Sequence, residues 1–202
     1  MLTWLTTNRA GDVMYDDLNG DGEVTSGSST LGDHGDLTVI GNSYARYNFG
    51  LTLDGSWKGL DFSVFLQGVM KRDYWLSGPY FWGASGDEWQ SACFTEHLDY
   101  WTPDNPDAYY PKPYFGGITK NQQVQTGYLQ NAAYLRVKNV QIGYTLPKSW
   151  TQKASMESVR FYVSGDNLLT LTGISAIFDP ETLGGMTYPI NRKVAIGLNL
   201  TL

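Results

Sequence analysis

The chain has 202 residues and a net charge of −6, with 14% aromatic and only 17% charged residues. Charged residues usually make up about a quarter of a soluble domain, so this chain is charge-poor. It contains no basic run, which argues against a nucleic-acid surface. The single cysteine, Cys93, excludes an internal disulfide, and with two histidines a Cys/His zinc site is not expected. No stretch approaches the ~18 apolar residues of a membrane-spanning helix. Many aromatics and 23 glycines favour an all-β chain.

Five runs alternate between apolar and polar residues, which is the pattern of a strand with two different faces. The predicted strands are residues 45–54, 60–70, 134–146, 157–165 and 193–202. A weaker strand is predicted within residues 3–15. Within 134–146 the alternation changes phase at Lys138-Asn139, which predicts a β-bulge.

Alternation alone does not tell whether the apolar face meets a protein core or lipid. Three features favour lipid. The runs have the ~9–11 residues that a tilted strand needs to cross a bilayer, aromatic residues gather near their ends, and short connections alternate with long ones. With the tight turn after residue 54 on the periplasmic side, the C-terminus is also expected in the periplasm.

The number of strands is too small for a closed barrel, since small single-chain barrels need about eight. The long loop predicted at 71–133 contains five prolines and does not supply the missing strands. An open sheet edge is not tolerated in lipid. We therefore interpret the chain as a fragment of a larger barrel.

Short motifs follow one another in a fixed order from about residue 11 to the end of the chain. They are 16–22 (DDLNGDG), 46–50 (RYNFG), 57–63 (WKGLDFS), 65–68 (FLQG), 133–147 (AYLRVKNVQIGYTLP), 163–168 (VSGDNL), 179–181 (DPE) and 188–189 (YP). In this order and spacing, the chain resembles the C-terminal part of the SusC/RagA-type TonB-dependent outer-membrane transporters.

This resemblance implies the C-terminal segment of a 22-strand transmembrane β-barrel in the bacterial outer membrane, spanning residues 1–202. The plug domain and the segment that contacts TonB would precede residue 1 and are expected to be absent here. The family imports oligosaccharides (glycans) or peptides, captured together with a SusD-like surface lipoprotein. The implied function is transport, without enzymatic chemistry.

One local motif suggests a metal. Oxygen-bearing side chains at alternate positions followed by glycine match the first half of a calcium loop. The candidate calcium ligands are Asp17, Asn19, Asp21 and Glu23. The twelfth position of the loop carries Ser28 in place of the usual glutamate. A metal-free turn, rich in residues that hydrogen-bond their own backbone, is the alternative interpretation.

The loop at 71–133 is rich in aromatic residues, which can bind a partner or a ligand or can simply pack the loop together. The candidate partner or ligand residues are Trp75, Trp82, Trp89, Trp101, Tyr109 and Tyr110. The acids of the same loop, Asp87, Glu88, Glu96 and Asp99, are interpreted as solvated rather than as a glycosidase pair, because nothing spaces them across a cleft.

Charged residues on the polar sides of the predicted strands would face the barrel lumen. These lumen-facing candidates are Arg46, Asp61, Arg136, Lys138 and Arg160. We expect them to pair with one another or with the plug. The alternative function from another class is a secreted, calcium-dependent carbohydrate-binding β-sandwich. A glycan-degrading enzyme is a third, weaker hypothesis.

Overall fold

The computed structural model describes residues 8–83, 93–114, 119–183, 188 and 190–202. The chain divides into two compact units. The first unit consists of Met1–Asn42 and Tyr74–Gln130, and the second of Ser43–Asp73 and Asn131–Leu202. The second unit contains most of the regular structure.

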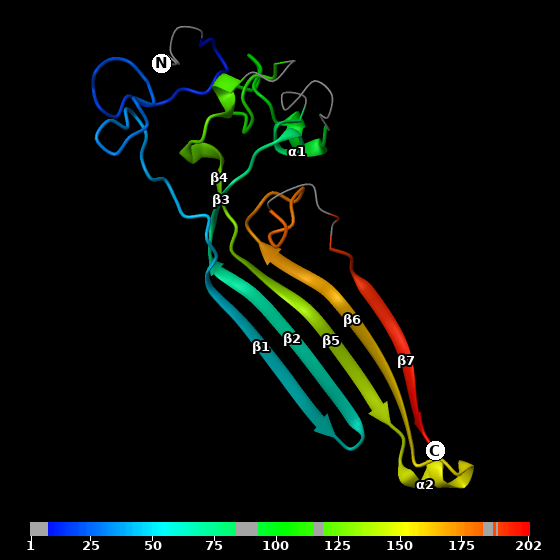
Figure 1. Ribbon diagram of the computed structural model, residues 1–202. Coiled ribbons are helices and arrows are strands. Elements are labelled where there is room, and N and C mark those ends of the chain that lie inside the picture. Colours follow the sequence, from blue (N-terminus) through cyan, green and yellow to red (C-terminus); the bar gives the residue numbers. More distant parts are fainter. Residues whose placement is uncertain (1–7, 84–92, 115–118, 184–187, 189) are drawn as a thin grey trace. The chain divides into compact units, whose positions relative to one another are not determined.

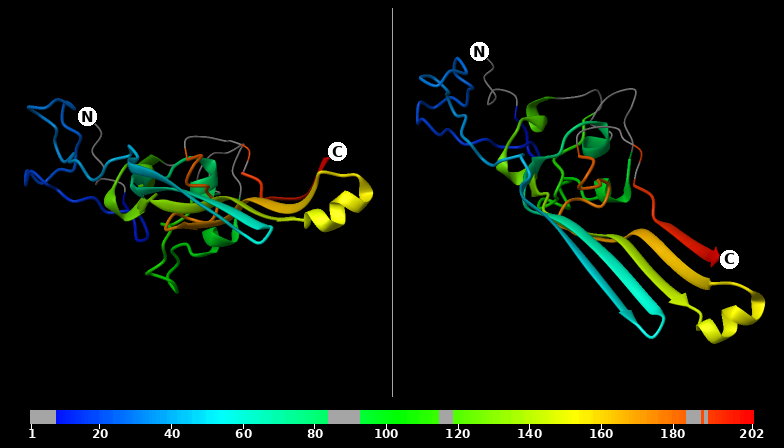
Figure 2. Two further views of the ribbon diagram at one scale, coloured as in Figure 1. Left: turned by 90° about the horizontal axis from the view of Figure 1, so that it is seen from below. Right: turned by 60° about the horizontal axis from the view of Figure 1, so that its bottom comes forward.

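The second unit is built on one five-stranded antiparallel sheet (Figure 1). Its strands are β1 (Arg46–Trp57), β2 (Leu60–Lys71), β5 (Tyr134–Thr145), β6 (Ser158–Thr172) and β7 (Lys193–Thr201), and they lie in the order β1-β2-β5-β6-β7. The right view of Figure 2 shows the same succession, from the cyan β1–β2 hairpin to the red β7. The expectation of an antiparallel, mostly β chain is confirmed.

The hairpin between β1 and β2 is tighter than the predicted connection at 54–59. Trp57 pairs directly with Leu60, so only Lys58 and Gly59 form the turn. Their φ angles of 48° and 87° both lie in the left-handed region. Two such residues form the type I′ turn whose twist matches that of paired strands, and glycine is favoured there because it has no Cβ. The tight turn extends β1 three residues beyond its predicted end.

The predicted bulge in β5 is confirmed, because the pairing with both neighbouring strands shifts next to Lys138. The facing strand β6 is also irregular: Val137 pairs with Leu169 while Asn139 pairs with Asp166. Asn167, with φ at 53°, lies inside this irregularity. This irregularity interrupts the alternation of β6. The sequence pattern therefore predicts a strand only as far as residue 165, whereas β6 continues to Thr172.

The described part of the predicted loop at 71–133 contains short elements of regular structure, and none of its strands joins the five-stranded sheet. Two three-residue strands, β3 (Asp73–Trp75) and β4 (Leu129–Asn131), pair with each other at its ends. A one-turn helix, α1 (Pro79–Trp82), follows β3, and short 3₁₀ turns lie at Thr95–Leu98, Thr119–Gln122 and Thr126–Tyr128. Such short elements leave no periodicity in a sequence.

The connection from β5 to β6 contains the short helix α2 (Lys148–Thr151) and a 3₁₀ turn at Gln152–Ala154. The weak strand predicted within 3–15 is wrong for residues 8–15, which form no strand. Among the residues that the structure describes, no helix is long and apolar enough to cross a membrane.

Candidate functional site

The two faces of the sheet differ sharply in chemistry. Residues paired across neighbouring strands share a face, so the register assigns each side chain. One face carries Leu51, Leu53, Phe62, Ile142, Phe161, Val163, Ile196 and Leu198. All eight are exposed, from Phe62 at 45% to Ile196 at 83%. Single exposed apolar residues are ordinary, but a continuous face of this size marks an interaction with a protein or a membrane.

The opposite face is polar, and several of its charges form ion pairs. Arg160 on β6 reaches over β5 to Asp61 on β2, with Nε–Oδ1 and Nη2–Oδ2 distances of 3.0 and 2.5 Å. Its guanidinium crosses directly above Gly143, where a Cβ atom would lie 2.4 Å from Nη2. Glycine at this position therefore leaves the space through which the bidentate pair is formed.

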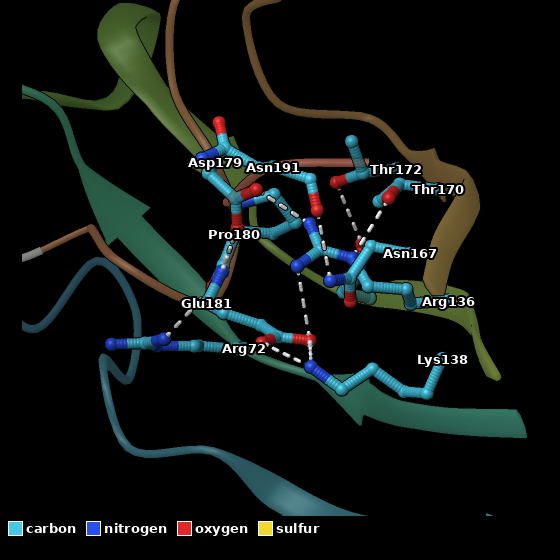
Figure 3. Close-up of polar contacts among 11 residues, drawn as sticks. Arg72, Arg136, Lys138, Asn167, Thr170, Thr172, Asp179, Pro180, Glu181 and Asn191 are labelled. Carbon is cyan, nitrogen blue, oxygen red and sulfur yellow. Dashed lines mark hydrogen bonds and ion pairs between the residues drawn. The ribbon is translucent and has the colours of Figure 1, made fainter. Parts of the chain in front are cut away.

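A second and more buried charge cluster lies on the same face, near the end of β6 (Figure 3). Arg136 of β5 is only 2% exposed. Its Nη2 donates to Asp179 Oδ2 at 2.6 Å, its Nε donates to Thr170 at 2.8 Å, and its Nη1 lies 3.2 Å from Glu181 Oε1. Lys138 adds a further ion pair to Glu181 Oε2 at 3.0 Å.

The acids of this cluster come from the segment that connects β6 to β7, so the cluster holds that segment against the polar face. Arg72, just after β2, strengthens the attachment by donating to the carbonyl of Pro180 at 3.4 Å and to that of Ser43 at 3.0 Å. In Figure 3 the guanidinium of Arg136 lies between Asp179 and Glu181. We call the set Arg72, Arg136, Lys138, Asp179 and Glu181 the loop latch.

The predicted lumen-facing residues thus fall into two groups. Asp61, Arg136, Lys138 and Arg160 take part in ion pairs, whereas Arg46 is exposed at the start of β1 and forms no ion pair with a described residue. Sequence reasoning missed Asp179 and Glu181 as the partners of Arg136 and Lys138, and it missed Arg72, which binds the backbone of the same segment. The only signal was the DPE motif at 179–181, because alternation identifies strand faces but not the loop that returns to them.

The candidate calcium residues form a set of turns closed by side chains. The carboxylate of Asp17 accepts hydrogen bonds from the amides of Gly20 at 2.6 Å and Gly22 at 2.8 Å. Asp21 accepts from the amide of Glu23 at 2.8 Å. Asn19 donates to Asp21 and accepts from its amide, both at 2.9 Å. These bonds are those of an aspartate-rich turn that closes on its own backbone.

Asp36 closes the same region by accepting from the amides of Leu18 and Thr25, each at 2.7 Å. The hydrogen bond from Thr25 is the main reason that the pKa of Asp36 is lowered. Within the described residues, no group of three or more His, Cys, Asp or Glu side chains is arranged to hold a metal ion. Calcium binding here stays a prediction.

Most of the candidate aromatic residues pack against one another in the first unit. Trp82 and Tyr110 are buried, and they surround Phe81, which is fully buried, at ring-centroid distances of 4.9 and 5.6 Å. Trp75 lies 6.1 Å from Trp82. Edge-to-face and tilted contacts of this kind stabilise beyond the area they bury. For these residues, packing of the loop is the role that their burial favours.

Tyr109 and Trp101 lie closer to the surface. Tyr109 is 40% exposed and accepts a hydrogen bond from Gln130 at 2.9 Å. Trp101 covers Gly11, where a Cβ atom would lie 2.4 Å from the indole. Trp89, the remaining candidate, lies outside the described residues.

A buried ion pair fixes the beginning of the described chain within the first unit. The Asp12 carboxylate pairs with Lys120 and accepts hydrogen bonds from the amide of Arg9 at 2.7 Å and from Asn121 at 3.1 Å. Burial raises the pKa of Asp12, but the bonds from Lys120, Arg9 and Asn121 outweigh it and lower the pKa from 3.8 to about 2. Asp12 is therefore ionised at neutral pH.

Taken together, the second unit has one exposed apolar face, one polar face with internally paired charges, and strands of 9 to 15 residues. These features are typical of the walls of transmembrane β-barrels. In a sandwich the apolar face would be covered by a second sheet. No second sheet covers it among the described residues, so the carbohydrate-binding sandwich is not supported.

Comparisons with known proteins show which proteins this chain resembles. No protein-family model matches the chain. The TonB-dependent receptors P3 and P26 of Formosa agariphila are 27% and 26% identical to it, over 94% and 95% of this chain. The aligned regions cover 19% and 20% of those receptors, so the chain spans about a fifth of their length.

Comparison with solved structures also finds similarity to transport proteins of the RagAB type. The structure of the RagAB peptide transporter matches with a TM-score of 0.59 and 29% identity, covering 76% of this chain and 17% of that one. The RagAB peptide importer in its "open-open" state matches with a TM-score of 0.56 and 26% identity, covering 77% and 17%. The resemblance to SusC/RagA-type TonB-dependent transporters is thereby confirmed.

Proposed function

We propose that the sheet forms part of the wall of an outer-membrane β-barrel of about 22 strands, with its apolar face toward lipid and its polar face toward the lumen. The observation that carries this proposal is the exposed apolar face. A strand of 12 residues is about 40 Å long, and a tilt of about 45° reduces the span to about 28 Å, close to the bilayer core. The tilted sheet is therefore tall enough to span the hydrocarbon core of a bilayer.

The remaining strands of the barrel are supplied by the rest of a longer polypeptide. The outer edges of β1 and β7 pair with no described strand, and an unpaired edge is not tolerated in lipid. The chain covers only about a fifth of the receptors it matches. These two facts support a wall segment that is completed by its neighbours.

The complete protein then works as a TonB-dependent importer of glycans or peptides, together with a SusD-like surface lipoprotein, in the bacterial outer membrane and with the end of β7 on the periplasmic side. The names of the relatives support transport and not an enzymatic reaction. The paired charges of the polar face suit this function. They give a polar wall suited to water, past which solutes move without covalent chemistry.

The test is made in the native bacterium, with the complete protein. Cells that contain it, cells that lack it and cells that lack TonB are given labelled oligosaccharide and peptide mixtures. We expect the complete protein in the outer-membrane fraction and TonB-dependent uptake of at least one mixture, lost in both mutant strains. Recovery in the soluble fraction, or unchanged uptake in its absence, would contradict the proposal.

A further inference from the structure

The first unit contains a cavity that has no part in the proposed role of the sheet as a barrel wall. It lies in the segment between β3 and β4, has a volume of about 200 Å³, and is walled mainly by rings. The rings that line it are Trp82, Phe94, His97, Tyr100, Tyr110 and Tyr114. An apolar cavity of ~150 Å³ is large enough to hold benzene, so this one accommodates one six-membered ring with a short attachment.

The wall of the cavity is held in place before any ligand arrives. The amide of Phe94 donates to His97 Nδ1 at 3.0 Å, which leaves the ring proton on Nε2, 3.1 Å from the carbonyl of Phe81. The His97 ring in turn contacts Tyr110 edge-on at 5.1 Å. Because the buried Phe81 anchors both rings, little ordering is needed when a ligand binds.

The lining of the cavity favours an aromatic ring over a sugar ring as its occupant. A sugar carries a hydroxyl on almost every carbon, and each buried hydroxyl needs a hydrogen-bond partner. Two amide side chains, Asn121 and Gln122, line the cavity. That of Asn121 is already engaged, because its Oδ1 accepts from Val13 at 3.0 Å and its Nδ2 donates to Asp12 at 3.1 Å. An aromatic side chain makes no such demand and gains from edge and face contacts with the ring wall.

One charge at the cavity has no ionic partner among the residues that the structure describes. Lys112 lines it and forms no ion pair with any described residue, and its Nζ lies 5.8 Å from the Tyr114 ring. A cation beside a ring-sized apolar cavity complements a carboxylate next to an aromatic group. A peptide that ends in an aromatic residue carries both.

We propose that this cavity binds the aromatic C-terminal side chain of a peptide substrate, with its carboxylate opposite Lys112. The proposal rests on the proposed import function and narrows its substrate to peptides. It assigns the ring-lined cavity to substrate capture. The surrounding aromatic cluster holds the lining of the cavity in place.

Cys93 provides the readout, since it is exposed and lines the cavity. The complete protein in detergent is treated with a maleimide, and a Cys93→Ser variant shows which label belongs to this thiol. We expect the dipeptide Ala-Phe to slow the modification at concentrations about tenfold below those required of Ala-Ala, because only Ala-Phe buries a ring. The amide Ala-Phe-NH₂ is expected to need about fivefold more than Ala-Phe, and this difference should vanish in Lys112→Met.

A pair of matched variants separates the cavity from general effects on the loop. Leu98 lines the cavity and is 74% exposed, so Leu98→Trp fills it without disturbing a buried residue. Val124 is comparably exposed and lies outside the lining. We expect Leu98→Trp to abolish protection by Ala-Phe and Val124→Trp to preserve it. Equal protection by Ala-Phe and Ala-Ala, or protection that survives Leu98→Trp, would overturn the proposal.

Uptake measured in parallel distinguishes this proposal from the import function on which it rests. If TonB-dependent uptake persists while Ala-Phe fails to protect Cys93, the cavity assignment is wrong and the import function stands. If Ala-Phe protects Cys93 while uptake does not depend on the protein, the cavity binds the peptide but the import function is wrong, and with it the role in substrate capture.

Discussion

Replacing Arg136 by methionine is expected to detach the β6–β7 segment and to lower the free energy of unfolding by about 3 kcal/mol. The substitution keeps much of the side-chain volume but leaves Asp179 without its partner and Glu181 with Lys138 alone. Removing one member of a buried charge cluster is costly, because the remaining charges stay partly desolvated. The expected loss of stability lies at the low end of the ~3–5 kcal/mol typical of a broken buried ion pair, because both acids are partly exposed.

Two measurements check this expectation in the complete protein. Urea unfolding in detergent gives the loss of stability, and chymotrypsin cleavage after Phe178 reports release of the segment. Arg46→Met is the matched control, since Arg46 is exposed and forms no ion pair with a described residue. It should change stability by less than about 0.5 kcal/mol. An Arg136→Met variant that remains as stable and as protease-resistant as the control would show that the loop latch does not hold the segment.

An arginine in place of Val163 is expected to lower the stability of the membrane-inserted protein by about 2–4 kcal/mol, while an arginine at Ser164 should have much less effect. The two residues are neighbours near the middle of β6, and their partners on β7, Ile196 and Ala195, are neighbours as well. They therefore lie at nearly the same depth but on opposite faces. Only Val163→Arg would place a charge against lipid.

The measurement is urea unfolding of the two variants in lipid vesicles, together with the fraction of folded protein in outer membranes, read from heat-modifiable gel mobility. A larger loss for Val163→Arg than for Ser164→Arg supports the assignment of the faces. Similar losses would mean that the two faces of the sheet have similar surroundings, which is incompatible with a barrel wall.

Much of the sheet could be predicted from the sequence, because a strand with two different faces leaves a period of two that is visible within ten residues. The β5 bulge could be predicted for the same reason, since it reverses the phase at Lys138. The true end of β6 could not be predicted, because the irregularity around Asn167 breaks the pattern and the strand resumes afterwards.

The candidate sites were harder to predict because they depend on contacts between distant residues. Alternation placed Arg136 on the polar face, but its partner Asp179 lies 43 residues away on a segment without periodicity. In the same way, composition revealed an aromatic loop, but not that Trp82 and Tyr110 are buried in it. Residues that share a strand face are predictable, whereas the loop that packs against them is set by tertiary structure.

The central claim, that the apolar face of the sheet meets lipid, is tested most directly by spin labels at Val163→Cys and Ser164→Cys in the complete protein, reconstituted in lipid vesicles with Cys93 replaced by serine. Two relaxation agents report the surroundings of each label: oxygen, which concentrates in the bilayer, and a water-soluble nickel chelate, which stays in the aqueous phase. We expect the label at 163 to collide mainly with oxygen and the label at 164 mainly with nickel, with the same alternation at 196 and 195. Equal accessibilities at the two positions, or the reverse order, would contradict the assignment of this sheet to a transmembrane barrel wall.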